Sequence, residues 1–338
     1  MKKTAALLFL GAFLLVAGLG ARFYAYPRLT VVPADLDSKV VAENPPGEPA
    51  TYFSIAKLAE TTDELGNMTK AQVDQVSSEE VSAELDRDVL VVRTYACTDE
   101  ITEDCSTLRY PLSGALSTLA IDRHTGVPVD WSEASIETGG KVEKGVEFEG
   151  LTIKFPFNAQ KQTYQFWNAD LRTSVPVRFV KETSVDGLHA YEYRGAVEPT
   201  VLGQLDIPGS IIGRDEPTVT VDRVTSSETS YLVEPETGVI ISATSKQDSY
   251  ATLDGEKVMT ITNGTFTTPD DATAETVDTY RPLATALVAL RLWVPLVGTL
   301  VGLLLLGYGT LLASRRRRGG TSIAPDHTPV EAELADVR

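Results

Sequence analysis

Two uninterrupted apolar stretches lie near the ends of the chain. Residues 5–21 form 17 positions without a charge, and residues 292–313 form 22. As α-helices rising 1.5 Å per residue, they would measure about 26 and 33 Å, close to the thickness of the hydrocarbon core of a bilayer. The pattern therefore predicts two transmembrane helices that flank a large middle region.

Basic residues flank both stretches and predict their orientation. Lys2 and Lys3 precede the first, and Arg315–Arg318 follow the second. Since positive charges stay on the cytoplasmic side, we expect a two-pass cell-membrane protein with both termini in the cytoplasm. The predicted parts are a cytoplasmic N-terminus (1–4), a signal-anchor helix (5–26), an extracytoplasmic domain (27–283), a juxtamembrane start and helix (284–313) and a cytoplasmic tail (314–338). Cleavage of the first stretch as a signal peptide is the alternative.

The middle region alternates apolar and polar positions over short, β-branched and aromatic runs, which favours strands. Few helical periods interrupt these runs, so we expect a β-rich (α+β) domain, mainly antiparallel. Residues 59–88 are polar and are expected to form helix or loop. Thr268 and Pro269 should start a helix, as its N-cap and first residue, that runs toward Tyr280. The expected strands cover residues 51–58, 88–98, 116–123, 151–157, 175–180, 189–197, 218–224, 229–234, 238–245 and 257–266.

Turn dipeptides separate several of these runs. Asp186-Gly187, Asp254-Gly255 and Asn263-Gly264 are typical of tight turns. Residues 119–127 (LAIDRHTGV) also resemble residues 232–239 (LVEPETGV). Each copy predicts a hairpin whose glycine takes a positive φ. A repeat and two similar hairpins explain the likeness equally well.

The charge of the 338-residue chain is unevenly distributed. The formal net charge is −17, but residues 27–283 hold 43 acidic and 21 basic residues. A middle region this acidic would repel nucleic acid, so we expect no nucleic-acid partner.

Cys97 and Cys105 are the two cysteines, and both lie in the region predicted to be exported. A disulfide is the expected role there. Catalytic and cofactor-binding motifs are absent from the sequence, and His124 and His189 are weak candidates for a hydrolase. We therefore expect no enzyme, no catalytic residue, no metal and no cofactor.

Residues 150–167 form the densest aromatic stretch of the chain. Aromatic rings with lysines among them could contact a lipid, with the lysines meeting an anionic head group. A core hairpin with lysines at its edge is the alternative. The candidate ligand contacts are Lys154, Phe155, Phe157, Lys161, Tyr164 and Trp167.

Gly298 and Gly302 form a GxxxG pattern in the second apolar stretch. Such a face lets another helix approach closely, so it predicts pairing with the first helix or with a second copy. The small-residue content usual in membrane helices is the alternative explanation.

Several blocks of the sequence resemble the actinobacterial porin PorA family, a domain of unknown function. They are residues 120–126, 150–171, 176–180, 187–193, 207–210 and 231–241. The resemblance implies an envelope protein without an established activity or catalytic residues. The plan of a helix near each end and a β-rich outer domain is also similar to the CD36 scavenger-receptor class, by analogy of architecture alone.

The sequence supports three hypotheses of function. The first is a membrane-anchored envelope protein whose outer domain binds or conducts a hydrophobic or lipidic ligand. The second is a structural or assembly partner, either as a homo-oligomer or with another envelope protein. The third is an oligomeric pore, because two helices from a single copy cannot enclose an aqueous channel.

Overall fold

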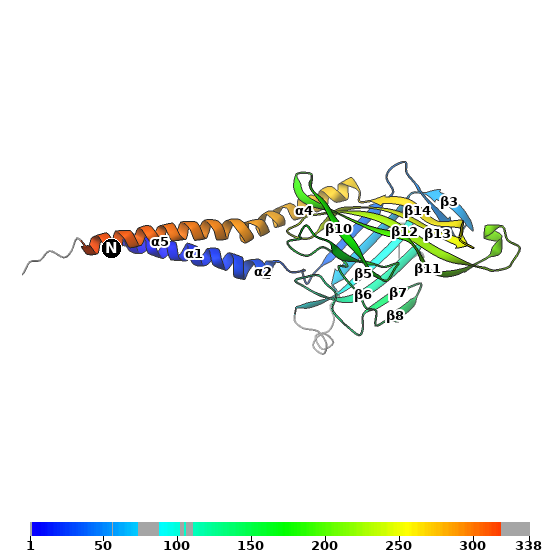
Figure 1. Cartoon of the computed structure of the whole chain (residues 1–338), viewed down its shortest axis with the longest axis horizontal. Coiled ribbons are helices and arrows are strands. Elements are labelled where there is room, and N and C mark those ends of the chain that lie inside the picture. The colour runs from blue at the N-terminus through cyan, green and yellow to red at the C-terminus, as the bar shows by residue number, and fades with distance from the viewer. Residues whose placement is uncertain (1, 56, 74–87, 102–104, 106–110, 319–338) are drawn as a thin grey trace, which may run out of the picture. The chain divides into compact units, whose positions relative to one another are not determined.

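The computed structural model describes residues 2–55, 57–73, 88–101, 105 and 111–318. The chain divides into two compact units (Figure 1). The helical unit comprises Met1–Pro27 and Ala289–Arg338, and the β unit comprises Arg28–Val288.

The helical unit contains the two long apolar helices that the sequence predicts. The first consists of α1 (Lys2–Gly20), the π-helical segment η1 (Ala21–Ala25) and the start of α2 (Tyr26–Leu29). The second consists of the π-helical segment η4 (Ala289–Trp293) and α5 (Val294–Arg318). Both are long and apolar enough to cross a membrane. Their side chains have no polar stripe, which is typical of helices surrounded by lipid or buried in protein.

The β unit is built on one antiparallel sheet of 14 strands in the described residues. Their order across the sheet is β8-β7-β6-β5-β4-β1-β14-β13-β12-β11-β10-β9, with β2 and β3 branching from β14. The strands are β1 (Asp37–Glu43), β2 (Ala50–Ser54), β3 (Ala59–Asp63), β4 (Leu65–Val73), β5 (Val89–Glu100), β6 (Ser113–Asp122), β7 (Ser135–Thr138), β8 (Lys141–Lys144), β9 (Tyr164–Asn168), β10 (Thr173–Val185), β11 (Leu188–Ile207), β12 (Val219–Val233), β13 (Ile240–Leu253) and β14 (Glu256–Thr267). The short 3₁₀ segment η3 (Gly209–Ile212) follows β11. The prediction of a mainly antiparallel β-rich region is confirmed.

The sheet consists of a first half, β8-β7-β6-β5-β4-β1, and a second half, β14-β13-β12-β11-β10-β9, that meet at a narrow joint. Strand β1 pairs along its length with β4, but it pairs with β14 only at Glu43 and Thr267. Buried Asn44 reinforces this joint, because its Nδ2 donates to the Thr265 carbonyl at 2.6 Å and its Oδ1 accepts from the Leu65 N–H at 2.8 Å.

The two outer edges of the sheet are joined by side chains. Arg172, beside β9 and β10, forms an ion pair with Glu143 of β8. The ring of Phe148 lies 4.9 Å from the ring of Trp167 on β9. The sheet therefore curls back on itself.

Residues 148–159 pack between the two halves. Phe148 and Ile153 pack against the cluster on β4–β6, which includes buried Val92 and Leu119. Leu151 and Phe155 belong instead to the cluster on β9–β12. We call residues 148–159 the wedge segment.

Helix α4 (Asp270–Val288) covers part of the second half of the sheet. Its Val277 and Ala284 are buried against Leu188, Ala190 and Ile241. The helix extends beyond Tyr280, to Val288, and continues through Pro282 without a break.

The start of α4 differs from the prediction. The Thr268 hydroxyl lies 3.0 Å from the Ala243 N–H, which donates to it, and so it continues the sheet rather than capping the helix. The carbonyl of Pro269 accepts the first helical bond, from the Thr273 N–H. Pro269 thus takes the N-cap position, so the helix begins one residue later than expected.

Three other predictions about elements were wrong. Residues 59–63 and 65–73 form strands β3 and β4, although their side chains are polar. Residues 151–157 form no strand, and only Leu151 bridges to Phe166. Asn263-Gly264 lies inside β14 instead of in a turn, because it pairs with Asp248 and Gln247 of β13. Gly264 suits this place because a Cβ there would lie 2.8 Å from the Ala50 Cβ of β2. The turns at Asp186-Gly187 and Asp254-Gly255 are confirmed.

Candidate functional site

The two apolar helices pack against each other through glycines. A Cβ on Gly302 would lie 2.8 Å from the Gly11 carbonyl oxygen, and one on Gly298 would lie 2.9 Å from the Leu14 carbonyl oxygen. A Cβ on Gly18 would lie 3.4 Å from the Pro295 carbonyl oxygen. Gly11 of α1 meets Gly302 of α5, and the later Gly18 meets the earlier Pro295. The two helices are therefore antiparallel. Only glycine allows two backbones to approach this closely.

The outward face of this pair is apolar. Large side chains on both helices are exposed, and Leu304 is 72% and Phe9 75% exposed. Such a surface suits hydrocarbon and offers no polar lining for water. The exposed apolar residues are Phe9, Leu10, Phe13, Val16, Leu19, Val294, Leu296, Val297, Leu300, Val301, Leu303, Leu304 and Leu311.

Two matching turns lie in the β unit. After β6, the Asp122 carboxylate accepts the Thr125 N–H at 2.7 Å and the Thr125 hydroxyl at 2.9 Å. Between β12 and β13, the Glu234 carboxylate accepts the Thr237 N–H at 2.7 Å and the Thr237 hydroxyl at 2.6 Å. The glycines that follow have φ values of 73° and 74°, as the sequence likeness predicts. An acidic residue three positions before Thr-Gly therefore closes each turn.

The wedge segment contacts both turns. The Phe155 N–H donates to the Gly238 carbonyl at 2.9 Å, and the Ala159 N–H donates to the Pro235 carbonyl at 2.7 Å. On the other side, Lys154 lies beside Gly126, whose Cβ would be 3.9 Å from the Lys154 Cγ. The two turns therefore hold Lys154 and Phe155 between the two halves of the sheet.

Lys154 is the unusual charged group of this region. Its Nζ lies 3.3 Å from the centroid of the Phe157 ring. Burial lowers the pKa of Lys154 to about 7, although the Glu234 carboxylate opposes the shift. Near neutral pH this amine is therefore partly deprotonated, whereas ordinary surface lysines remain protonated.

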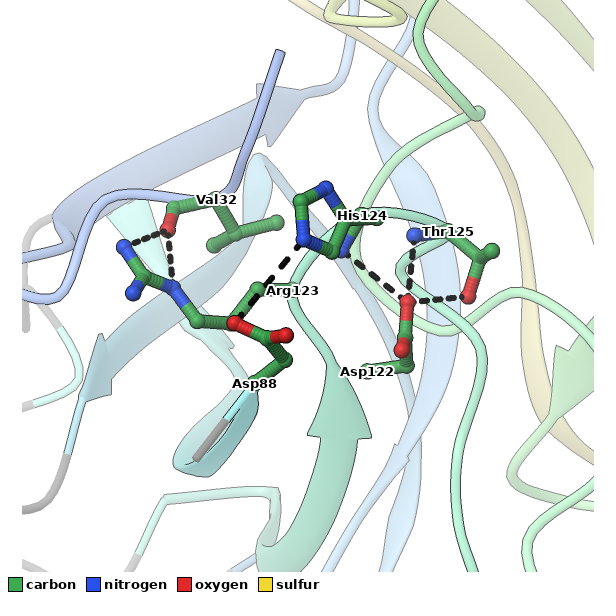
Figure 2. A network of polar contacts seen from close by, with 6 residues as sticks. All are labelled: Val32, Asp88, Asp122, Arg123, His124 and Thr125. Atoms are coloured by element: carbon green, nitrogen blue, oxygen red, sulfur yellow. Dashed lines mark hydrogen bonds and ion pairs between the residues drawn. The ribbon is translucent and has the colours of Figure 1, made fainter. Parts of the chain in front are cut away.

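Around Asp122, several polar contacts connect Val32, near the start of the β unit, with the turn that follows β6 (Figure 2). The Arg123 guanidinium donates through Nε and Nη2 to the Val32 carbonyl at 3.3 Å. His124 Nε2 lies 3.9 Å from the Asp88 carboxylate. Burial raises the pKa of Asp122, but hydrogen bonds from Thr125 and His124 outweigh this and lower the pKa overall. These contacts order the turn, with the Asp122 carboxylate directed at Thr125 and at the backbone N–H of His124 (Figure 2).

The predicted ligand contacts lie in different places. Phe155 is fully buried, 4.6 Å from the Tyr193 ring, and the Tyr164 ring packs edge-on against it. Lys161 is exposed and pairs with Glu182 at 2.6 Å. The structure thus brings Phe155 and Tyr164 together in the core. Lys154 and Phe157 form a separate pair, and Trp167 lies at the edge with Phe148.

The two best-formed hollows among the described residues are small. The two best formed measure about 40 Å³ each. The first lies beside Phe166, Trp167 and Tyr231, at the end of the aromatic stretch. Pockets for drug-sized ligands usually measure roughly 300–1,000 Å³, so these hollows suit water rather than a lipid chain.

The disulfide between Cys97 and Cys105 is confirmed. Cys97 lies on β5, opposite Met68 of β4 and Gly114 of β6. The bridge attaches the chain beyond β5 to the middle of the first half of the sheet.

Sequence reasoning missed Asn44 and the electrostatic influence of Glu234 on Lys154. The likeness of residues 119–127 and 232–239 was the signal for the two turns. Asn44 gave no signal, because its partners are distant in sequence.

Comparison with known proteins gives a family match over nearly the whole chain. The family described as Porin PorA matches residues 4–311, from α1 through most of α5. A porin PorA of Corynebacterium amycolatum is 25% identical over 228 residues. This alignment covers 60% of the chain and 59% of the length of that relative.

Proposed function

The chain belongs to the porin PorA family, and we propose from this premise that it is a two-pass cell-envelope protein that works as a subunit of a larger assembly. In this proposal, the helices anchor the β unit to the cell membrane. The observation that supports this proposal most directly is the glycine-packed helix pair. Its backbones are in contact at Gly11 and Gly302, and its outer face is apolar. A pair packed this way leaves no room for water between its helices, so passage of water or ions along these helices would need other chains.

The proposed topology places both termini in the cytoplasm and residues 27–283 outside. Lys2 and Lys3 at one end of the antiparallel pair, and Arg315–Arg318 at the same end, support it. The polar outer positions of the long strands support contact with water. Strand β12 carries Thr, Ser, Asp and Glu, and β13 carries Ser, Thr, Gln, Lys and Asp.

Assembly with other chains is tested by crosslinking in intact membranes. Lysine-reactive crosslinking of the full chain should give a discrete larger species, either a homo-oligomer or a complex with another envelope protein. A chain that remains monomeric at crosslinker concentrations that join a known membrane dimer would contradict the proposal.

An oligomeric pore is the second candidate, and family membership favours it. The pore would lie between copies, since the described helix pair has no lumen of its own. Purified full chain in planar bilayers should then give discrete conductance steps whose frequency rises with a power of protein concentration above one. Conductance that rises in proportion to concentration would indicate a channel within a single copy and contradict this arrangement.

A lipid bound by the aromatic stretch has less support. Phe155 fills the core, Lys161 pairs with Glu182, and the hollow beside Trp167 is far smaller than an acyl chain. Lipid extraction from the purified full chain tests this alternative. A tightly retained lipid that is lost in a Trp167→Ala variant but kept in a Trp131→Ala variant would support it.

A further inference from the structure

The two π-helical segments of the helical unit lie at the same level. Gly11 faces Gly302, and Gly18 faces Pro295. Eleven residues beyond Gly11 lies Arg22, and eleven residues before Gly302 lies Arg291. Because the helices are antiparallel, both arginines lie about 16 Å from the glycine contact in the same direction. Segments η1 and η4, which contain them, also contact each other.

Exposed aromatic side chains surround this level. Phe23 is 75% exposed, Tyr24 65% and Trp293 60%. Aromatic rings of this kind gather where hydrocarbon meets the head groups of a bilayer. π-helical turns within α-helices are rare and frequent at functional sites. The level of Arg22 and Arg291 therefore has the features of a membrane interface.

The charges at this level are of a single sign. The sequences 2–27 and 289–318 contain no Asp or Glu, so the helical unit places two guanidinium groups at one height without contributing a carboxylate. Arg22 also stacks over the Tyr26 ring, 5.3 Å from its centroid, which fixes its side chain. Guanidinium groups bind phosphate through paired hydrogen bonds, and two of them at one level complement a single anion.

We propose that Arg22 and Arg291 together bind the phosphate of an anionic phospholipid. The proposal rests on the proposed insertion of the two helices in the bilayer. A lipid suits the site better than free phosphate, because exposed Phe23, Leu292 and Trp293 flank the arginines and would contact the glycerol and upper acyl chain.

Quenching of tryptophan fluorescence by spin-labelled lipids tests the proposal on the full chain. Trp293 lies at the site, while Trp131 and Trp167 belong to the β unit and give a constant background. In phosphatidylcholine vesicles with small amounts of labelled lipid, labelled phosphatidylglycerol should quench Trp293 about 3–10-fold more effectively than labelled phosphatidylcholine. The combined Arg22→Gln and Arg291→Gln variant should lose this preference, whereas Arg315→Gln, at the opposite end, should keep it.

The outcomes separate this inference from the proposed function. Equal quenching by both lipids in the unaltered chain, or a preference kept in the double variant, would overturn the phospholipid site alone. Absence of quenching by either lipid would overturn membrane insertion and the site with it. Loss of the preference on adding millimolar inorganic phosphate, at constant ionic strength, would show a free-anion site and overturn the lipid assignment.

Discussion

Lys154 is half-buried among the residues around it, and the partial desolvation of its charge opposes folding. The amine lies over Phe157 and beside Gly126, and Glu234 offsets only part of the cost of burial. Charged groups without full compensation are retained in proteins at a cost to stability. The stability of the β unit should therefore depend on pH through this residue.

The sign of this dependence follows from the depressed pKa. In the unfolded chain Lys154 has a pKa near 10.4, and in the folded chain the pKa is about 7. Between these values the unfolded state binds more protons, so the contribution of Lys154 to the free energy of unfolding rises with pH from about 7 to about 10. Below pH 7 both states are protonated, and the full penalty, on the order of a few kcal/mol, remains.

A Lys154→Met variant should therefore be more stable than the unaltered chain at pH 7, and the difference should shrink by pH 10. Urea unfolding of the full chain in detergent micelles, at several pH values, measures this. Lys141→Met is the matched control, because Lys141 is exposed on β8 and should show no such trend. Equal stability of the Lys154→Met variant and the unaltered chain across this range would contradict the account.

The surroundings of Lys154 show the limit of the sequence at this scale. The aromatic stretch was visible, and the sequence left open whether it formed a core or a contact surface. Its side chains divide between the core and the surface according to neighbours on β9–β12 and in the two turns, which are distant in sequence. The Thr-Gly turns were visible as a likeness, because their bonds are local.

Asn44 connects the two halves of the sheet. Replacement of Asn44 by Ala leaves the buried Leu65 N–H without its acceptor, and this should cost about 1–3 kcal/mol of stability. Urea unfolding of the full chain gives the value. Asn263→Ala, which removes an exposed bond to Asp248, is the control and should cost less than about 0.5 kcal/mol. Equal costs for the two variants would mean that the joint does not depend on Asn44.

The helix pair depends on its glycines. Leu in place of Gly302 would collide with the Gly11 backbone and Leu15, so the pairing should weaken by about 1–3 kcal/mol. Gly307→Leu is the matched control on the same helix, because a Cβ there meets nothing within 4 Å. In a titration of the full chain with SDS, followed by circular dichroism, the transition should occur at a lower SDS concentration for Gly302→Leu alone. Similar midpoints for the two variants would refute the glycine contact.

The disulfide should contribute to the first half of the sheet. A combined Cys97→Ser and Cys105→Ser variant loses a closed loop of about nine residues, which loop entropy values at roughly 2.6 kcal/mol. Thermal unfolding of the full chain in detergent checks this loss. An unchanged unfolding temperature would show that the rest of β5 orders this part of the chain without the bridge.

At the scale of elements, composition predicted the helices and most strands. The two apolar helices are predicted unambiguously, because uncharged apolar runs of the length that spans a bilayer are rare in soluble proteins. Strands β3 and β4 were missed because their side chains are polar, and their positions are set by backbone pairing with β2, β1 and β5. The wedge segment was expected to be a strand, because a buried loop between two sheet halves carries the same apolar residues.

The whole molecule combines a β sheet that closes through side chains with a helix pair that has no lumen. The closure through Arg172 and Glu143, and the joint at Asn44, depend on the curvature of the sheet, which no local sequence pattern encodes. The porin name of the family therefore fits an assembly of several chains better than a channel within one chain.

Accessibility of single cysteines in intact cells tests the proposed topology most directly. The native cysteines are paired, so a membrane-impermeant maleimide reports only the added thiol. The account predicts that a Val201→Cys variant, exposed on β11, is labelled in intact cells, while a Ser322→Cys variant is labelled only after permeabilisation. Labelling of Ser322→Cys in intact cells, with Val201→Cys protected, would contradict it.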